Sequence, residues 1–315
     1  HESWLLYLLD YGVRFNHIEA LNSVELSLQK MSQGGIRDHI GGGFHRYTTD
    51  FQWKTPHFEK MLYTQAQLAR VYLLAYKITA KKSYADIAKE ILDYALAELL
   101  TDDGVFYSAT DAGSLHEEGD YFLWTEKQVK AALTDDLSLL AISLYGLTEQ
   151  GNVKNKGKNI FFLNESLEKY ALQHELSLKA LEHDVSTIKV QLNHARKQRE
   201  APFIDRKILT AWNAMMINSL VMASEVLDDI KYLEAAKKIA DVIWEDIDVN
   251  SQQLWRVNLK GKSSIPASQE DYAYYAQALL SLYDQSGNKR WLEKAEIITD
   301  KMLLLFWDFK QGGLF

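Results

Sequence analysis

Residues 61–79, with the sequence MLYTQAQLARVYLLAYKIT, carry apolar side chains on every face of a helix. A helix of this kind has to be packed on several sides. Residues 84–99 are one-sided instead, because their apolar side chains form a single stripe, with Asp86, Lys89 and Asp93 lying off it. This order predicts an inner helix followed by an outer helix that keeps one face in water.

The same pair recurs twice further along the chain. The apolar segments 211–227 and 272–283 are each followed by an amphipathic segment, 232–244 and 291–307 respectively. A similar turn follows each outer helix, at Gly104-Val105-Phe106, Ser251 to Leu254 and Gly312-Gly313-Leu314, with an earlier copy at Gly34-Gly35-Ile36. Glycine suits a helix end that needs a positive φ. At least four helical hairpins are therefore expected.

The fold class that this repetition predicts is all-α, in the form of an (α/α) toroid of helical hairpins. An inner ring of helices packed on both sides favours a toroid, and an open superhelix is the competing architecture. We expect one domain over 1–315 with a helical insertion at about 115–200, where extra helices fall around 126–145 and 165–199. The chain starts at His1 and stops on a repeat turn at Phe315, so we expect the natural N-terminus and the C-terminal end of the toroid to be missing.

Composition removes several classes of function. The chain of 315 residues has 35 basic and 43 acidic side chains, a net charge of −8, without long blocks of one sign, which argues against a nucleic-acid binder. It has no cysteine, so thiolate metal sites and thiol nucleophiles are excluded. No apolar stretch approaches the ~20 residues of a membrane helix. We expect no membrane contact, no cofactor and a cytoplasmic location.

Carboxylates follow the three prolines of the chain, each of which stands just before a predicted inner helix. These acids are Glu59 after Pro56, Asp205 after Pro202, and Glu270 and Asp271 after Pro266. If the hairpins close into a ring, the acids converge on one mouth, where carboxylates act as acid and base or hold sugar hydroxyls. The alternative is purely structural, because acids in a first helical turn are favoured by the helix dipole and by capping.

Candidate catalytic residues concentrate in and after the loop from Gly41 to Met61. We predict His57 as general base with Glu59 or Asp111 as acid, since a neutral imidazole both accepts and donates protons near pH 7. Aromatic side chains near the mouth suit stacking on a sugar, and core packing explains them equally well. The predicted substrate-binding residues are His45, Arg46, Trp53, Glu118, Asp205, Trp212, Asn213, Asp271 and Tyr272. No metal site is predicted, because the spacing of His39, His45 and His57 matches no known ligand pattern.

Four segments together resemble one known family. They are the run from Gly41 to Met61, the Phe106-Tyr107-Ser108-Ala109 turn with Asp111, Glu118 and Gly119, the segment Leu209 to Asn213, and Glu270 to Ala273. They are similar to the thioredoxin-domain-containing proteins of the spermatogenesis-associated protein 20 type, including bacterial YyaL-like proteins. The resemblance implies a thioredoxin-like domain, absent from this chain, followed by a six-hairpin toroid akin to N-acylglucosamine 2-epimerases and six-hairpin glycosidases. Gly113 and Ala214 depart from the family pattern, which usually has Asp and Gly there.

Two functions follow as expectations. The first is a carbohydrate-active protein, a sugar epimerase or a glycoside hydrolase, with its acid and base at the toroid mouth. The second is a non-catalytic binding or scaffold module that works with the attached thioredoxin-like domain. A cyclase-like toroid for apolar substrates is a third idea, based on 17 tyrosines, 12 phenylalanines and 8 tryptophans. Aromatic core packing explains those numbers more simply.

Overall fold

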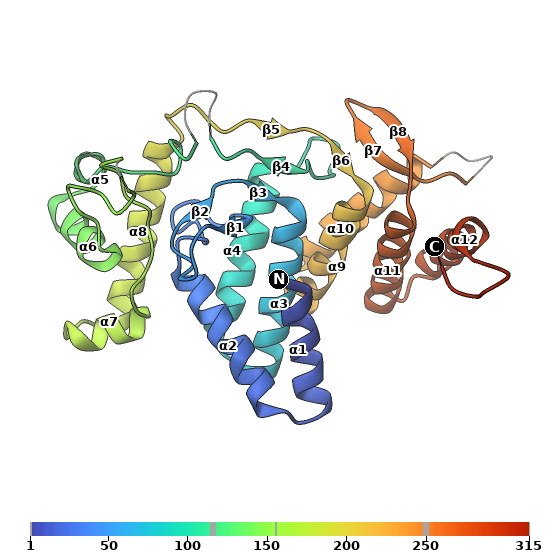
Figure 1. The fold of residues 1–315 in the computed structure, drawn as a ribbon, viewed down its shortest axis with the longest axis horizontal. Coiled ribbons are helices and arrows are strands. Elements are labelled where there is room, and N and C mark those ends of the chain that lie inside the picture. The colour runs from blue at the N-terminus through green and yellow to red at the C-terminus, as the bar shows by residue number, and fades with distance from the viewer. Residues whose placement is uncertain (1, 114–117, 155, 248–251, 315) are drawn as a thin grey trace. The chain divides into compact units, whose positions relative to one another are not determined.

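A computed structural model describes residues 2–113, 118–154, 156–247 and 252–314. Helices account for most of these residues and alternate along the chain with loops and short strands (Figure 1). The helices are α1 (Glu2–Arg14), α2 (Ile18–Gln33), α3 (Leu62–Thr79), α4 (Lys82–Glu98), α5 (Glu126–Ala132), α6 (Asp135–Tyr145), α7 (Leu167–Gln173), α8 (Leu178–Arg196), α9 (Thr210–Val226), α10 (Ile230–Glu245), α11 (Gln269–Ser286) and α12 (Lys289–Phe306). The three predicted inner–outer pairs are therefore confirmed.

Short strands accompany the helices, which the helical periodicity alone did not predict. They are β1 (Tyr47–Thr48), β2 (Pro56–His57), β3 (Lys60–Met61), β4 (Ala109–Thr110), β5 (Ile204–Asp205), β6 (Ile208–Leu209), β7 (Trp255–Leu259) and β8 (Lys262–Pro266). β7 and β8 form an antiparallel hairpin with Leu259 opposite Lys262, and β6 pairs with β7. The two-residue turn Lys260-Gly261 has positive φ at both positions, as such hairpins require.

The chain divides into two compact units. Unit 1 comprises residues 1–7, 61–109 and 204–315, and unit 2 comprises residues 8–60 and 110–203. The predicted insertion at about 115–200 falls within unit 2, apart from the part of it that lies outside the described residues. The expectation that residues 1–315 form a single domain stays a prediction.

Unit 1 contains a layer of inner helices and a layer of outer helices. Helix α9 packs between α3 and α11, and each of these three helices also packs against the helix that follows it, α10, α4 and α12 respectively. Most residues of α9 are buried, whereas α10 buries only the stripe that contains Tyr232, Ala236 and Ile239. This difference is the one that the apolar and amphipathic patterns predict, because hydrophobic burial stabilises each packed face by roughly 1.5–3 kcal/mol per large side chain.

Hydrogen bonds from buried and half-buried side chains fix the register of the inner helices. Ser219 of α9 donates to the carbonyl of Ala66 in α3 at 2.6 Å, and Ser281 of α11 donates to Asn218 of α9 at 2.7 Å. Tyr275 of α11 donates to the carbonyl of Ala240 in α10 at 2.7 Å. Buried polar groups of inner helices therefore have partners on neighbouring helices, which specifies one packing arrangement.

Unit 2 has its own hydrophobic core. Helix α8 contacts α5, α6 and α7, and the core between them includes Trp124, Tyr145 and Ile188. A smaller apolar cluster packs Phe58 against Phe122, whose rings are stacked with centroids 5.5 Å apart. This smaller cluster supports the loop from Gly41 to Met61.

Two details of the sequence-based expectations need correction. The glycine at the turn after α2 has φ −69°, and it is required instead because a Cβ at Gly34 would lie 2.3 Å from the carbonyl oxygen of Trp53. Of the acids that follow prolines, Glu270 and Asp271 lie in a first helical turn, whereas Glu59 lies between β2 and β3 and Asp205 lies in β5. Helix-dipole stabilisation therefore explains Asp271 and leaves Glu59 and Asp205 to other contacts.

Candidate functional site

The candidate site in unit 2 begins with the alternation of residues 56–60. Pro56, Phe58 and Lys60 are buried, whereas His57 and Glu59 are partly exposed. Because side chains of an extended chain point alternately to opposite faces, His57 and Glu59 share the outer face. The pairing of β1 with β2 places Tyr47 opposite His57, and the two rings are stacked with centroids 5.0 Å apart.

His57 lies between two carboxylates. Its Nδ1 is 2.6 Å from Oε1 of Glu118, and its Nε2 is 3.3 Å from Oε2 of Glu59. Oε2 of Glu59 also accepts a hydrogen bond from Nη1 of Arg46 at 3.1 Å. The side chains of His57 and Glu59 are each 25% exposed and that of Glu118 is 53% exposed, so solutes can reach all three. We call these four residues the His57 centre.

The His57 centre has the elements of a proton-transfer site. A carboxylate oxygen of Glu118 accepts a hydrogen bond from Nδ1–H, which orients the ring and leaves Nε2 for proton exchange. Glu59 stands on the Nε2 side and is itself held by the guanidinium of Arg46. Four residues that the sequence nominated separately are thus in direct contact.

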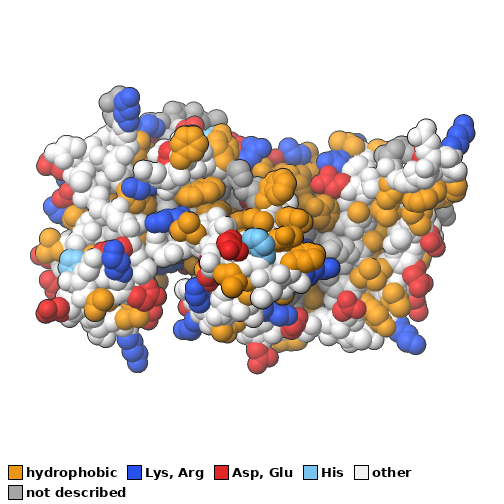
Figure 2. Space-filling model, turned by 60° about the horizontal axis from the view of Figure 1, so that its bottom comes forward, with side chains coloured by type: hydrophobic (Ala, Val, Ile, Leu, Met, Phe, Trp, Pro, Cys, Tyr) orange, Lys and Arg blue, Asp and Glu red, His pale blue; other side chains and the backbone are white. Residues whose placement is uncertain are grey.

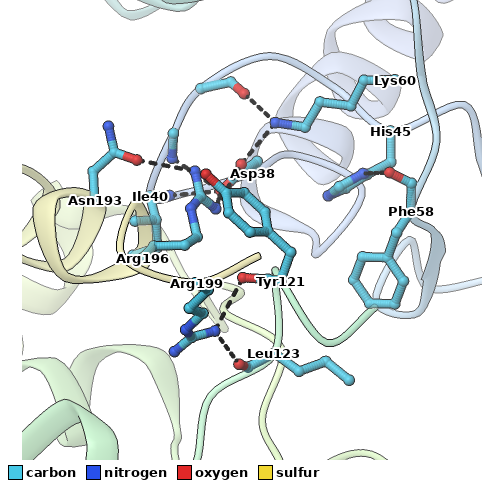
Figure 3. A network of polar contacts seen from close by, with 12 residues as sticks. Asp38, Ile40, His45, Phe58, Lys60, Tyr121, Leu123, Asn193, Arg196 and Arg199 are labelled. Atoms are coloured by element: carbon cyan, nitrogen blue, oxygen red, sulfur yellow. Dashed lines mark hydrogen bonds and ion pairs between the residues drawn. The ribbon is translucent and has the colours of Figure 1, made fainter. Parts of the chain in front are cut away.

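A buried ionic network lies within the same unit (Figure 3). Oδ2 of Asp38 is 2.7 Å from Nζ of Lys60, and both carboxylate oxygens of Asp38 accept hydrogen bonds from Arg196, at 3.0 and 2.9 Å. Lys60 also donates to the carbonyl of Gly42 at 2.7 Å. Burial alone would raise the pKa of Asp38, but the charges of Arg196 and Lys60 outweigh it and hold that pKa well below its usual range. The network ties the loop from Gly41 to Met61 to helix α8.

Gly41 shows why this loop is rich in glycine. A Cβ at Gly41 would lie 1.8 Å from Nη2 of Arg196, so the guanidinium occupies the space that a side chain would need. The backbone N–H groups of Ile40 and Gly41 both donate to Asp38 at 3.0 Å. The glycine run therefore serves the buried network.

His45 is part of this interior. It is 2% exposed, and its Nδ1 is 2.9 Å from the carbonyl oxygen of Phe58. A carbonyl can only accept, so the ring carries its hydrogen on Nδ1. Burial first and the charge of Lys60 second lower the pKa of His45 to about 3, so the ring is neutral at pH 7. Its observed contacts position the backbone next to His57.

Asp111 also belongs to unit 2. Its carboxylate accepts the N–H of Ala112 at 2.6 Å, and its own N–H donates to the carbonyl of Phe203 at 2.8 Å. Among the described residues its carboxylate has no recorded contact with His57. Gly113 forms an isolated bridge with Glu118, so the backbone around Asp111 is joined to the segment that carries Glu118. The catalytic role predicted for Asp111 stays a prediction.

In unit 1, two of the predicted substrate-binding residues, Asn213 and Tyr272, hold the backbone of a turn. Asn213 accepts the N–H of Phe106 at 2.8 Å and donates to the carbonyl of the same residue at 3.0 Å. The hydroxyl of Tyr272 accepts the N–H of Leu254 at 3.2 Å. Each side chain therefore connects an inner helix to the turn that follows an outer helix.

Asp271 is 1% exposed and supports the start of two inner helices. Its carboxylate accepts N–H groups from Ser268 at 2.9 Å and from Ala211 at 3.2 Å. It also pairs with Arg256, whose Nη1 is 3.1 Å from Oδ2. The contacts of Asp271 are those of a buried cap with a charged partner.

Trp212 and Asp205 are more accessible. The ring of Trp212 packs edge-on against Tyr63 with centroids 4.9 Å apart. Asp205 pairs with Lys207 at 2.8 Å, and its backbone carbonyl accepts the hydroxyl of Ser108 at 3.0 Å. Burial would raise the pKa of Asp205, but hydrogen bonds from Lys207 and Ser108 lower it overall. These two residues lie in unit 1, whereas the His57 centre lies in unit 2.

Trp53 lines a hollow of about 400 Å³ in unit 2. The lining residues come from the end of α2, from the loop between β1 and β2, and from residues 162–164. His57, Glu59 and Glu118 are not among these lining residues. Trp53 therefore lies in the hollow and His57 lies outside it, although the two residues are only four positions apart in the sequence.

Sequence reasoning missed several residues that shape the site. Asp38, Lys60 and Arg196 form the buried network, and Tyr47 stacks on His57. In residues 56–60, apolar and polar side chains alternate at the first four positions, and continuing this alternation would have predicted that Lys60 is buried. Among the described residues no group of three His, Asp or Glu side chains could hold a metal ion, and no described helix is both long and apolar enough to cross a bilayer.

Comparison with known proteins gives sequence relatives. No protein-family model matches the chain. The human protein named spermatogenesis-associated protein 20 is 37% identical over 321 residues, which cover 92% of this chain and 41% of the human protein. This chain is similar to spermatogenesis-associated protein 20. It spans about two fifths of the length of the curated relatives it matches. These homologues support the family resemblance seen in the sequence.

Solved structures of the same fold are more distant in sequence. An α-mannanase of glycoside hydrolase family 76 from Bacteroides thetaiotaomicron has a TM-score of 0.56 at 15% identity, covering 99% of this chain and 63% of that chain. Cellobiose 2-epimerase from Spirochaeta thermophila has a TM-score of 0.55 at 12% identity, covering 94% and 57%. The predicted fold class, an all-α (α/α) toroid, is confirmed. Glycoside hydrolases and sugar epimerases share this fold, and at such identities the likeness shows the fold alone.

Proposed function

We propose that this chain is a carbohydrate-active protein whose acid–base chemistry takes place at the His57 centre. The observation that carries the proposal is one imidazole in contact with Glu118 through Nδ1 and with Glu59 through Nε2. Proton transfer requires a base that a neighbouring group holds in position, and here Glu118 orients the imidazole while Glu59 lies on its other side. The occurrence of the fold among sugar epimerases and glycoside hydrolases supports a sugar as the substrate class.

Epimerisation fits these contacts better than hydrolysis. In epimerisation, Nε2 of His57 removes the proton beside the carbonyl of an open-chain sugar and the electron pair moves onto the carbonyl oxygen; once the intermediate has turned over the ring, the protonated Nε2 returns the proton to the opposite face of the carbon and the carbonyl re-forms. Hydrolysis needs one carboxylic acid that gives its proton to the leaving group. Glu59 is held by Arg46 and Glu118 by His57, which favours their ionised forms.

Isotope exchange tests this proposal directly. The chain is incubated with cellobiose, glucose and mannose in D₂O, and NMR follows deuterium entering C2 and the appearance of the C2 epimer. We expect His57→Gln to lower turnover about 10²- to 10⁴-fold and Glu118→Gln to lower it less, because Glu118 orients the base. His183→Gln, at an exposed position of α8, is the matched control.

Two results would contradict the assignment. Unchanged exchange in His57→Gln rules out its role as base. Release of reducing ends from an α-1,6-linked mannan without any exchange at C2 identifies the reaction as hydrolysis, and the roles of Glu59 and Glu118 then have to be reassigned.

A non-catalytic binding or scaffold module is the second candidate. The observation that favours it is that polar atoms of Asn213, Asp271 and Tyr272 are bonded to the backbone, so those atoms already have partners. In this proposal the toroid presents a surface while an attached thioredoxin-like domain performs redox chemistry. Saturable sugar binding without turnover by any variant would support it, and measurable turnover that depends on His57 would exclude it.

The family resemblance also implies three further properties, which we propose together with the function. A thioredoxin-like domain in the longer protein, kinship with bacterial YyaL-like proteins and a cytoplasmic location are all expectations from the resemblance and the composition. Mass spectrometry and fractionation of the natural protein test them.

A further inference from the structure

The hollow beside Trp53 has the composition of a second binding site. Its volume of about 400 Å³ lies within the range of small-molecule pockets. Aromatic side chains are contributed by Phe51, Trp53 and Phe162, and carboxamides by Gln52 and Asn164. Aromatic faces stack on the C–H face of a pyranose, and carboxamides both donate to and accept from hydroxyl groups.

The loop that carries Trp53 is held by one carboxylate. Asp50 accepts the backbone N–H groups of Gln52 at 2.7 Å, Lys54 at 3.2 Å and Thr55 at 2.5 Å. The carbonyl of Trp53 accepts the N–H of Ile36 at 3.0 Å. The backbone under the Trp53 ring is therefore fixed before any ligand arrives, which reduces the entropy lost on binding.

Trp53 has a backbone conformation that is unusual for its side chain. Its φ is +62°, in the left-handed region that favours glycine and asparagine. Strain of this kind persists where the surrounding structure imposes it and gathers at ligand sites. A large ring at such a position points to a role for the ring itself.

The charged groups of the hollow have one sign. Lys30 and Lys54 line it, and no carboxylate is among its described lining residues. The ammonium of Lys54 lies 4.6 Å from the centre of the Phe162 ring, which keeps the charge at the wall of the hollow. We propose that this hollow binds a pyranose that carries an anionic group, a carboxylate or a phosphate.

This site is separate from the proposed function, because it uses none of the residues of the His57 centre. The pyranose ring stacks on Trp53, its hydroxyls bond to the carboxamides, and its anionic group pairs with Lys54 and Lys30. Binding is expected whether or not the chain catalyses any reaction at His57.

The test measures binding by saturation-transfer NMR with four probes on the 315-residue chain. The probes are D-glucuronate, glucose 6-phosphate, D-glucose and inorganic phosphate. We expect both anionic sugars to bind at least tenfold more tightly than glucose and than inorganic phosphate. Preference between glucuronate and glucose 6-phosphate identifies which anionic group the site takes.

Trp53→Asn separates binding from folding. Asparagine tolerates a positive φ, so the melting temperature should stay unchanged or rise by a few degrees, while affinity for the anionic sugars falls at least tenfold. Lys54→Gln should weaken the anionic sugars about tenfold and leave glucose unchanged. Lys77→Gln, an exposed lysine of α3 paired with Glu225, is the matched control and should change neither.

Three outcomes would overturn the proposal. Equal affinity for glucose and glucuronate removes the anionic requirement. Unchanged binding in Trp53→Asn removes the hollow as the site, even if a sugar binds elsewhere. A large loss of melting temperature in Trp53→Asn together with unchanged binding shows that the ring serves packing.

Discussion

At the scale of single residues, the sharpest feature is an excess of buried positive charge in unit 2. Asp38 meets two cations, Lys60 and Arg196, and neutral His45 lies in the same interior. Removing one partner of a buried ion pair leaves the other charge out of water, which costs several kcal/mol of folding free energy. Removing one partner of an exposed pair costs much less, because the remaining charge is solvated. Asp38 is therefore the residue on which the loop from Gly41 to Met61 depends most.

Replacing Asp38 tests this directly. Asp38→Asn leaves Lys60 and Arg196 without their carboxylate, and we expect a loss of about 3–5 kcal/mol in the free energy of unfolding at pH 7. Urea denaturation measures it. Asp86→Asn on the exposed face of α4, where Asp86 is 3.9 Å from Lys82, should cost no more than about 0.5 kcal/mol. Equal effects at both positions would contradict the account.

His45 makes stability depend on pH. Its pKa is lowered to about 3 in the folded chain, so as pH falls below about 6.5 the unfolded chain binds a proton that the folded chain does not. The free energy of unfolding should therefore fall by about 1.5 kcal/mol between pH 6.5 and 5, above the range in which the carboxyl of Asp38 takes up a proton in the unfolded chain. Denaturation at several pH values measures the slope. His45→Gln should flatten it and the exposed His183→Gln should not; an unchanged slope in His45→Gln contradicts the prediction.

At the scale of elements, inner helices are joined to the turns that follow outer helices by single side chains. Asn213 of α9 bonds to both backbone groups of Phe106, and Tyr272 of α11 bonds to Leu254. The turns after α4 and α10 thus take their positions from side chains of later helices, 107 and 18 positions away along the chain. These side chains connect successive hairpins in unit 1.

Removing the amide of Asn213 should release its turn. Asn213→Ala leaves the N–H and carbonyl of Phe106 without that partner, at a cost of about 2–4 kcal/mol. Hydrogen exchange at Phe106 should become faster, and denaturation measures the loss. Asn22→Ala, on the exposed surface of α2, is the control and should be nearly neutral. Unchanged protection at Phe106 would show that the turn is held by other contacts.

At the scale of the whole molecule, the charge balance limits the partners. The net charge is −8, and Figure 2 shows acidic and basic side chains interspersed over the face in view. Because the net charge is negative, the overall attraction of the chain to phosphate backbones is expected to be weak. This expectation is independent of the reaction proposed for His57.

Nucleic-acid binding tests that property. Fluorescence anisotropy with labelled double-stranded DNA should give a dissociation constant weaker than about 10⁻⁴ M at physiological salt, with almost no further change as salt is raised. Tighter binding that weakens steeply with salt would contradict this expectation.

The candidate site was predictable only in part. His57, Glu59, Glu118 and Arg46 were named from the sequence and are in contact. His45, Asn213 and Tyr272 were named with them and instead bond to the backbone. A polar side chain in a loop or at a helix start suits either role, and burial, which decides between them, is not a local property of the chain.

The sequence alone determined the inner and outer helices and their order, because a helix exposes a repeat of 3.6 residues whose apolar stripe can be read from neighbouring positions. Tertiary structure alone decided which side chains meet. His57 and Glu118 are 61 positions apart, and Asp38 and Arg196 are 158 positions apart. Contacts over such separations depend on how the intervening elements pack, and no periodicity in the chain encodes them.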